Sequence, residues 1–214
     1  SKLHVDADGT VTGWVDGGSD LSVGRSRMFI SGKFDATPTA VGDATGRTTA
    51  QFARFNTTST HSVELRIATS FISTDQAERN MDLEVTGKSF DAVRATARAA
   101  WNKRLSVIDE PQASQVQKVN VYSDMYRLNL YPNSQSENTG SAASPRWQYA
   151  SPVSAKKGEA SDTRTNAQVV AGKIFVNNGF WDTYRTAWPA YSLLYPDVAE
   201  ELVDGFVQQY RDGG

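Results

Sequence analysis

The most unusual group of polar and aromatic side chains is the run W-D-T-Y-R, formed by Trp181, Asp182, Thr183, Tyr184 and Arg185. A carboxylate accepts two hydroxyl hydrogen bonds, a guanidinium donates several, and an aromatic ring covers the apolar C–H face of a sugar. These residue types are those with which a protein would bind a polyol, although the spacing alone favours the structural interpretation that follows. In that interpretation, Asp182 caps a helix, Arg185 is its ion-pair partner or a surface charge, and Trp181 lies in the core.

Other chemistries have less support. The sequence has no cysteine and two histidines, His4 and His61, which excludes disulfides, thiolate metal sites, cysteine nucleophiles and a multi-histidine zinc site. Aspartates near glycines at 6–20 weakly suggest a calcium loop, but their spacing matches no EF-hand pattern. The acidic residues at 75–84 and 200–204 are typical of solvated helix faces, so they indicate no catalytic carboxylate pair.

Composition limits the class of protein. The chain of 214 residues has 39% hydrophobic residues, and its 22 basic and 24 acidic residues leave a net charge of −2. It therefore lacks the positive charge with which proteins neutralise nucleic-acid phosphates, and we expect no nucleic-acid partner. No apolar run approaches the roughly 18 residues of a membrane span, and the first residues lack a charged stretch followed by an apolar one, so we expect neither a membrane span nor a signal peptide in this sequence. Because the sequence has no initiator methionine and stops at 211–214, where a helix would end and its next element begin, we expect it to be part of a longer polypeptide.

Short strands separated by turns are predicted at 3–7, 10–15, 27–34, 48–55 and 62–70. The Asp8-Gly9 step between two of them is typical of a hairpin. Near the end of this region Val63, Leu65 and Ile67 alternate with charged or small residues, as in half of an antiparallel sandwich.

At Ser73 the apolar period changes to about 3.6, and S-T-D-Q at 73–76 predicts a capping box and a helix start. Ser89 is the predicted cap of a second helix, whose apolar stripe from 90 to 108 predicts a core helix, and a third helix is predicted at 116–131. The polar stretch 133–168 predicts a functional loop or a mobile insertion. An Asn-Gly step then predicts a hairpin of 173–176 with 179–181, followed by helices from 182 to 195 and from 197.

Four stretches, in the same order, resemble motifs of glycoside hydrolase family 92, a family of α-mannosidases. The run G-F-W-D-T-Y-R-T-A-W-P-A-Y-S-L-L-Y-P at 179–196 resembles its signature W-D-T-[FY]-R-x-x-x-P-x-x-x-L-x-x-P. Upstream, 70–77 is similar to its strand-to-helix junction, 90–105 to its connector helix, and 122–132 to the first helix of its catalytic domain.

The resemblance implies a mixed β and α fold with three parts. Residues 1–72 would be the end of an N-terminal antiparallel β-sandwich, 73–111 a helical connector, and 112–214 the first part of an (α/α)6 toroid that forms the catalytic domain. The pattern of strands followed by helices independently predicts two unlike domains, with a boundary between 71 and 111.

The resemblance also implies a function. Members of the family remove terminal α-linked mannose from mannans or N-glycans by an exo-acting, inverting, calcium-dependent reaction. It implies that Asp182 binds sugar hydroxyls and that Trp181, Thr183 and Arg185 line or support the same pocket. The catalytic acid and base and the ligands of Ca²⁺ would come from motifs beyond this sequence, so the 214 residues alone would be inactive. The implied partners are a mannose-containing glycan and the remainder of the polypeptide, and the implied location is secreted, periplasmic or cell-surface.

Two other hypotheses stay open. The chain could be a non-catalytic carbohydrate-binding β-sandwich with appended helices, in which Trp14 or Trp147 would be an exposed stacking platform. A helical scaffold without a ligand is supported by composition alone. Because Arg127 replaces a common histidine of the family and 133–168 does not align with it, the linkage specificity is also open.

Overall fold

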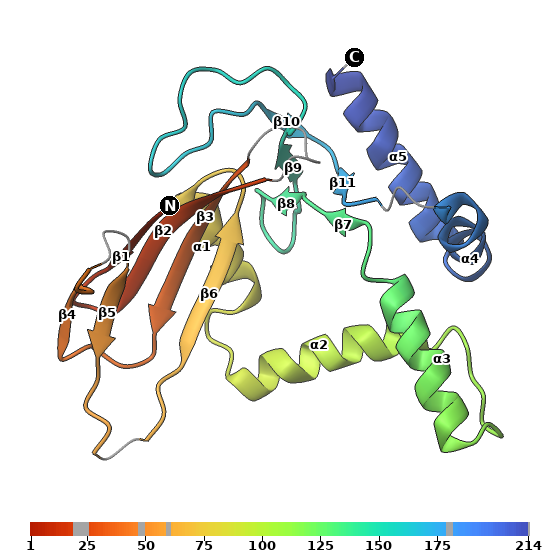
Figure 1. Ribbon diagram of the computed structural model, residues 1–214, viewed down its shortest axis with the longest axis horizontal. Helices are drawn as coiled ribbons and strands as arrows, with labels where there is room; N and C mark the ends of the chain where they lie inside the picture. Colours follow the sequence, from red (N-terminus) through yellow and green to blue (C-terminus); the bar gives the residue numbers. More distant parts are fainter. Residues whose placement is uncertain (19–25, 47–49, 59–60, 179–181, 214) are drawn as a thin grey trace. The chain divides into compact units, whose positions relative to one another are not determined.

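Strands and helices of the chain form two compact units in a computed structural model, which describes residues 1–18, 26–46, 50–58, 61–178 and 182–213 (Figure 1). The first unit comprises residues 1–87, 136–172 and 212–214, and the second comprises 88–135 and 173–211. The chain therefore passes from the second unit back into the first between 136 and 172. The mixed β and α class predicted from the sequence is confirmed.

An antiparallel sheet in the order β1-β2-β3-β6 forms most of the first unit. Its strands are β1 (Lys2–Val5), β2 (Thr10–Gly17), β3 (Ser26–Phe34) and β6 (Leu65–Ser70). The predicted hairpin between β1 and β2 is confirmed: Gly9 has φ 85°, and the Asp8 carboxylate accepts a 2.9 Å hydrogen bond from the amide of Thr10. Glycine suits this position because a positive φ costs it no steric strain.

A smaller sheet lies alongside, formed by β4 (Ala40–Asp43), which the sequence did not predict, and β5 (Gln51–Arg54). Gln51 in β5 accepts a hydrogen bond from the Val5 amide of β1 at 2.6 Å. The alternation around Val63, Leu65 and Ile67 correctly predicted a strand. However, the side chains of Leu65 and Ile67 remain 43% and 49% exposed, so this apolar face is only partly covered.

Helix α1 (Thr74–Glu84) packs on β3 and β6, with Ala77 fully buried. Only half of the predicted capping box forms. The Ser73 hydroxyl accepts from the Gln76 amide at 3.0 Å, as predicted. The Gln76 side chain does not reach back to the cap, because it donates to Asn80 at 2.8 Å and to the Asn138 carbonyl at 3.0 Å.

The stretch expected to be a loop or insertion contains regular structure. Strands β8 (Glu137–Asn138), β9 (Trp147–Ala150) and β10 (Val169–Ala171) form a sheet in the order β10-β9-β8 within the first unit. In the second unit β7 (Asn133–Ser134) pairs with β11 (Phe175–Val176). The second strand of the hairpin predicted at the Asn-Gly step, 179–181, lies outside the described residues.

Helices make up the rest of the second unit: α2 (Phe90–Leu105), α3 (Gln115–Leu128), the 3₁₀ turn η1 (Thr183–Arg185), α4 (Ala187–Leu194) and α5 (Pro196–Gly213). Their core is a cluster of buried side chains from Met125, Phe175, Tyr191, Tyr195 and Leu202. Among the residues that the structure describes, no helix combines the length and apolar character needed to cross a membrane.

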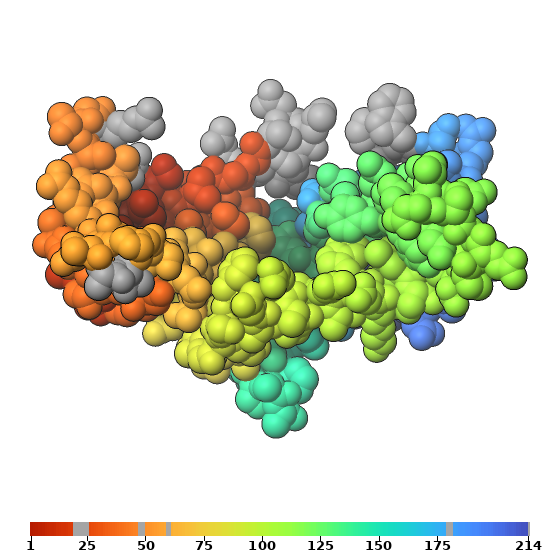
Figure 2. All heavy atoms as spheres, turned by 90° about the horizontal axis from the view of Figure 1, so that it is seen from below, coloured from red at the N-terminus to blue at the C-terminus, as the bar shows by residue number. Residues whose placement is uncertain are grey.

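The prediction that the second helix is a core helix was wrong for α2. None of its residues is buried, and the Phe90 side chain is 64% exposed. The surfaces of α2 and α3 are both visible in Figure 2, and a groove of about 720 Å³ lies beside α3, lined by side chains such as Leu105, Val119 and Tyr126. The apolar stripe of α2 is therefore only partly covered by the described residues.

Candidate functional site

Asp182 and Arg185 flank a single 3₁₀ turn that precedes α4. The Asp182 carbonyl accepts hydrogen bonds from the Arg185 amide at 3.0 Å and from the Thr186 hydroxyl at 3.1 Å, and these bonds close the turn. Closure places the two side chains three residues apart on one face, where the Arg185 guanidinium donates to the Asp182 carboxylate. The structure thus brings together two of the four predicted site residues as an ion pair.

This ion pair is open to solvent, with the Arg185 and Asp182 side chains 61% and 64% exposed. Asp182 makes no side-chain capping hydrogen bond, so the helix-cap interpretation lacks its defining contact. Among the described residues, the Asp182 carboxylate has no polar contact other than the one with Arg185. The carboxylate consequently retains acceptor capacity for the hydroxyls of a ligand.

The neighbours of the pair add aromatic surface. Tyr184 is 66% exposed, and the Arg185 guanidinium lies 5.2 Å from the centroid of its ring. Thr183 is half-buried within the turn. Trp181, the fourth predicted site residue, lies outside the described residues. Sequence reasoning included Tyr184 in the cluster but not among the site residues; its exposure beside Arg185 adds it to the candidate site.

Helix α4 holds the turn through buried aromatic residues. The Tyr191 hydroxyl lies 2.7 Å from the Leu128 carbonyl and 2.6 Å from that of Tyr131, at the end of α3, and can donate its proton to either. Burial raises the pKa of this phenol above its ordinary value. Trp188 meets the Tyr191 ring edge-on at 5.7 Å. The start of α4, and with it the turn, is therefore anchored to α3.

A second set of polar contacts joins α4 to α2 and α3. The Tyr195 hydroxyl donates to the Arg104 carbonyl at 3.0 Å, while the Arg104 side chain donates to Asn129 at 2.8 Å and lies over the Tyr195 ring at 4.6 Å. Sequence reasoning missed these residues, because the Tyr195–Arg104 bond spans 91 positions and no local pattern signals it.

The carboxylates of the described residues are candidate ligands for a calcium ion. Calcium takes six to eight oxygen ligands, yet among these residues no three acidic or histidine side chains gather in a metal-binding group. Glu137, whose pKa is raised by burial, is engaged by the amide of Phe71 at 2.8 Å and the side chain of Asn80 at 2.9 Å. It is therefore a half-buried carboxylate with a structural role.

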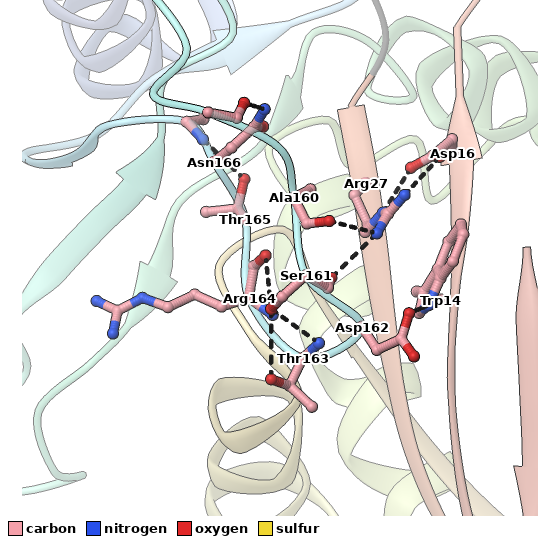
Figure 3. Close-up of polar contacts among 12 residues, drawn as sticks. Trp14, Asp16, Arg27, Ala160, Ser161, Asp162, Thr163, Arg164, Thr165 and Asn166 are labelled. Carbon is pink, nitrogen blue, oxygen red and sulfur yellow. Dashed lines mark hydrogen bonds and ion pairs between the residues drawn. The ribbon is translucent and has the colours of Figure 1, made fainter.

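Trp14, one of the two residues considered as an exposed platform for sugar stacking, has a ring face covered by another side chain. The Arg27 guanidinium lies 3.4 Å from the centroid of the Trp14 ring, and the indole nitrogen donates to Asp162 at 2.9 Å (Figure 3). Trp14 therefore gives little support to the binding-module hypothesis, which needs an open ring face at Trp14 or Trp147. Trp147, the other proposed platform, is 40% exposed on β9.

Comparisons with known proteins agree on one family. The sequence profile described as "Glycosyl hydrolase family 92 catalytic domain" matches residues 76–214. A solved family GH92 inverting mannosidase from Bacteroides thetaiotaomicron is 24% identical with a TM-score of 0.80, over 99% of this chain and 28% of that one. A family GH92 α-mannosidase from the same organism, in complex with mannoimidazole, is 19% identical with a TM-score of 0.73, over 98% and 27%.

A GH92 family glycosyl hydrolase is 20% identical with a TM-score of 0.69, over 99% of this chain and 27% of that chain. At these identities the likeness shows a common fold. The chain spans 27–28% of the length of these three solved chains. No curated protein sequence matches it.

Proposed function

The chain belongs to glycoside hydrolase family 92, and on this basis we propose that the polypeptide containing it removes terminal α-linked mannose from mannans or N-glycans. The observation that carries the proposal is the profile match over 76–214, because the matched range includes the exposed turn with Asp182 and Arg185. The similarity to solved mannosidases, one of them holding mannoimidazole, supports mannose as the recognised sugar.

In this proposal the turn binds the sugar and does not perform the proton transfers. Asp182 accepts hydrogen bonds from two sugar hydroxyls, since its carboxylate is exposed and bonded only to Arg185 among the described residues. Arg185 holds that carboxylate in place and donates to a further oxygen. By the family resemblance, Trp181 and Thr183 line or support the same pocket.

The chemistry itself needs groups from the remainder of the polypeptide. An inverting glycosidase requires one carboxylic acid to protonate the leaving oxygen and a second carboxylate, about 6.5–9.5 Å away, to activate water. The calcium ion that the family resemblance implies would likewise be held by residues beyond this sequence. The contribution of Asp182 and Arg185 is to orient the sugar.

The proposed partners are therefore a mannose-containing glycan and the remainder of the same polypeptide, and the proposed location is secreted, periplasmic or cell-surface.

The alternative of a carbohydrate-binding module without catalysis is weakened by Trp14, whose ring is covered by Arg27.

The test is hydrolysis by the intact polypeptide. We expect release of the aryl group from an aryl α-mannoside but not from the β-anomer, loss of activity with a calcium chelator, and β-mannose as the first product seen by proton NMR. A folded intact protein that binds α-mannosides without cleaving them would contradict the proposal and favour the binding module.

A further inference from the structure

Residues 136–172 belong to the first unit by their contacts, although they lie within the range that matches the catalytic-domain profile. The chain enters this segment directly after β7 and leaves it directly before β11, and these two strands pair with each other in the second unit. The two ends of the segment are therefore joined by this strand pair, while the residues between them pack in the first unit. Three sets of contacts attach 136–172 to the first unit.

The first attachment is at the beginning of the segment. Glu137 accepts hydrogen bonds from the Phe71 amide at 2.8 Å and from the Asn80 side chain at 2.9 Å. The next residue, Asn138, accepts from Gln76 through its carbonyl at 3.0 Å. All three donors belong to α1 or to the chain between β6 and α1, so this end is fixed to that junction.

The second attachment uses the backbone. The Thr165 amide donates to the Ile72 carbonyl at 3.0 Å, and the Thr74 amide donates to the Thr163 carbonyl at 2.9 Å. Together these bonds form a short antiparallel bridge that lies against the start of α1. Two backbone bonds add little net stability on their own, because each one replaces a hydrogen bond to water.

The third attachment is Arg27 on β3, which reaches the turn of the segment at 160–162 (Figure 3). Its guanidinium donates to both oxygens of Asp16, at 2.7 and 2.8 Å. It also donates to the carbonyls of Ala160 at 3.2 Å and Ser161 at 3.0 Å. The Arg27 side chain is only 13% exposed, because the Trp14 ring covers it. Hydrogen bonding to Asp16 raises the pKa of Arg27, so the group stays charged.

The turn at 160–162 also contributes a negatively charged side chain, that of Asp162. The Asp162 carboxylate accepts from the Trp14 indole at 2.9 Å and from Lys2 at 2.6 Å. Trp14 is thus held between Arg27, which binds the carbonyls of the turn, and Asp162, which belongs to it. Four hydrogen bonds from the first sheet, two of them donated by one guanidinium nitrogen of Arg27, converge on the three consecutive residues 160–162.

We propose that residues 136–172 form a strap across the first unit and that Arg27 is the latch at its far end. The strands β2 and β3 are joined by their own backbone ladder, which does not involve the Arg27 side chain. Loss of the latch therefore opens 158–167 while the sheet stays folded. Local opening of this kind is measurable because segments of one protein exchange their amide hydrogens independently.

The experiment is hydrogen exchange of the intact polypeptide, followed by mass spectrometry of peptides covering 72–76, 158–167 and 26–34. In the Arg27→Gln variant we expect exchange at 158–167 and at the Thr74 amide to be at least about tenfold faster, because charge-assisted bonds to the turn are lost and Thr74 donates to Thr163 of the same segment. Exchange at 26–34, in β3, should stay within about twofold of the parent. Arg27→Lys keeps the charge but loses the bidentate geometry, so its exchange rate at 158–167 should lie between those of the parent and Arg27→Gln.

Arg94→Gln is the matched control, because Arg94 makes an exposed ion pair with Asp91 at 3.0 Å on α2. If Arg27→Gln speeds exchange at 158–167 no more than Arg94→Gln does, the latch is refuted. If Arg27→Gln also speeds exchange at 26–34, the variant has disturbed β3 itself. Asp162→Asn is then the deciding variant, since it changes a residue of segment 136–172 and leaves β3 intact. Selective opening of 158–167 in that variant supports the latch, and unchanged exchange overturns it.

Discussion

Replacing Asp182 by Asn separates a sugar-binding carboxylate from a structural one. The substitution keeps the size of the side chain and one acceptor oxygen but removes the charge that pairs with Arg185. If Asp182 binds mannose in the intact enzyme, turnover should fall steeply while the fold is unaffected. If the ion pair only stabilises the turn, both effects should be small.

The effect on stability follows from exposure. Both side chains are more than 60% exposed and separated by three positions, and such pairs contribute about 0.3–0.5 kcal/mol because water and salt screen them. No capping hydrogen bond is lost, since Asp182 makes none. We therefore expect the free energy of unfolding to fall by no more than about 0.5 kcal/mol.

The effect on turnover is larger, because a ligand would exclude water from the same carboxylate. A hydrogen bond to a charged group is worth about 1.5–3 kcal/mol, and about 1.4 kcal/mol corresponds to tenfold in rate. The loss of one such bond to mannose lowers kcat/KM by about tenfold to 150-fold, and the loss of two lowers it further.

Steady-state hydrolysis of an aryl α-mannoside by the intact polypeptide and urea unfolding of both proteins measure these quantities. Asp124→Asn is the matched control, since Asp124 makes the same type of pair with Arg127 on α3 at 3.3 Å. Values of kcat/KM for Asp182→Asn within about twofold of those for Asp124→Asn would refute the binding role.

Three further predictions concern the packing and the buried groups. Gly205→Ala should destabilise the protein by about 1–2 kcal/mol in urea unfolding, despite the better helix propensity of alanine, because its Cβ would lie 2.6 Å from the Phe175 ring; a more stable variant would contradict this packing. Glu137, with a pKa raised by burial, holds its proton to higher pH in the folded state than in the unfolded state, so its contribution to stability is present below about pH 4.5 and is lost as pH rises through the folded pKa. The stability of Glu137→Gln relative to the parent should therefore improve between pH 4 and 7, and a difference independent of pH would argue against the buried carboxylate. Tyr195→Phe removes the donor to the Arg104 carbonyl and should cost about 1–2 kcal/mol, whereas an unchanged urea midpoint would mean that water replaces the hydroxyl.

Local signals in the sequence identified most of the elements. The serines at 73 and 89 accept hydrogen bonds from Gln76 and Ala92 at 3.0 and 3.2 Å, so both helix starts were predicted by residues within three positions of each other. The same pattern, S-x-x-Q, occurs at Ser114 and forms the complete capping box that Ser73 lacks. The difference arises because the Gln76 side chain meets a tertiary acceptor, the Asn138 carbonyl.

For the candidate site, the sequence predicted the local pairing of side chains but not their surroundings. A spacing of three residues is enough to pair Asp182 with Arg185 in a helical turn, and the structure confirms that pairing. The absence of a capping bond and the exposure of Tyr184 depend on how the turn meets α4, which the pattern does not encode. The pocket around the turn stays a prediction.

The sequence alone therefore established the family motifs, the hairpin at Asp8-Gly9 and the approximate bounds of the helices, because each depends on residues close together in the chain. The tertiary structure decided that 136–172 packs with the first sheet and that Arg27 covers Trp14. These contacts join residues as many as 160 positions apart, and their free energy arises only once both partners are folded.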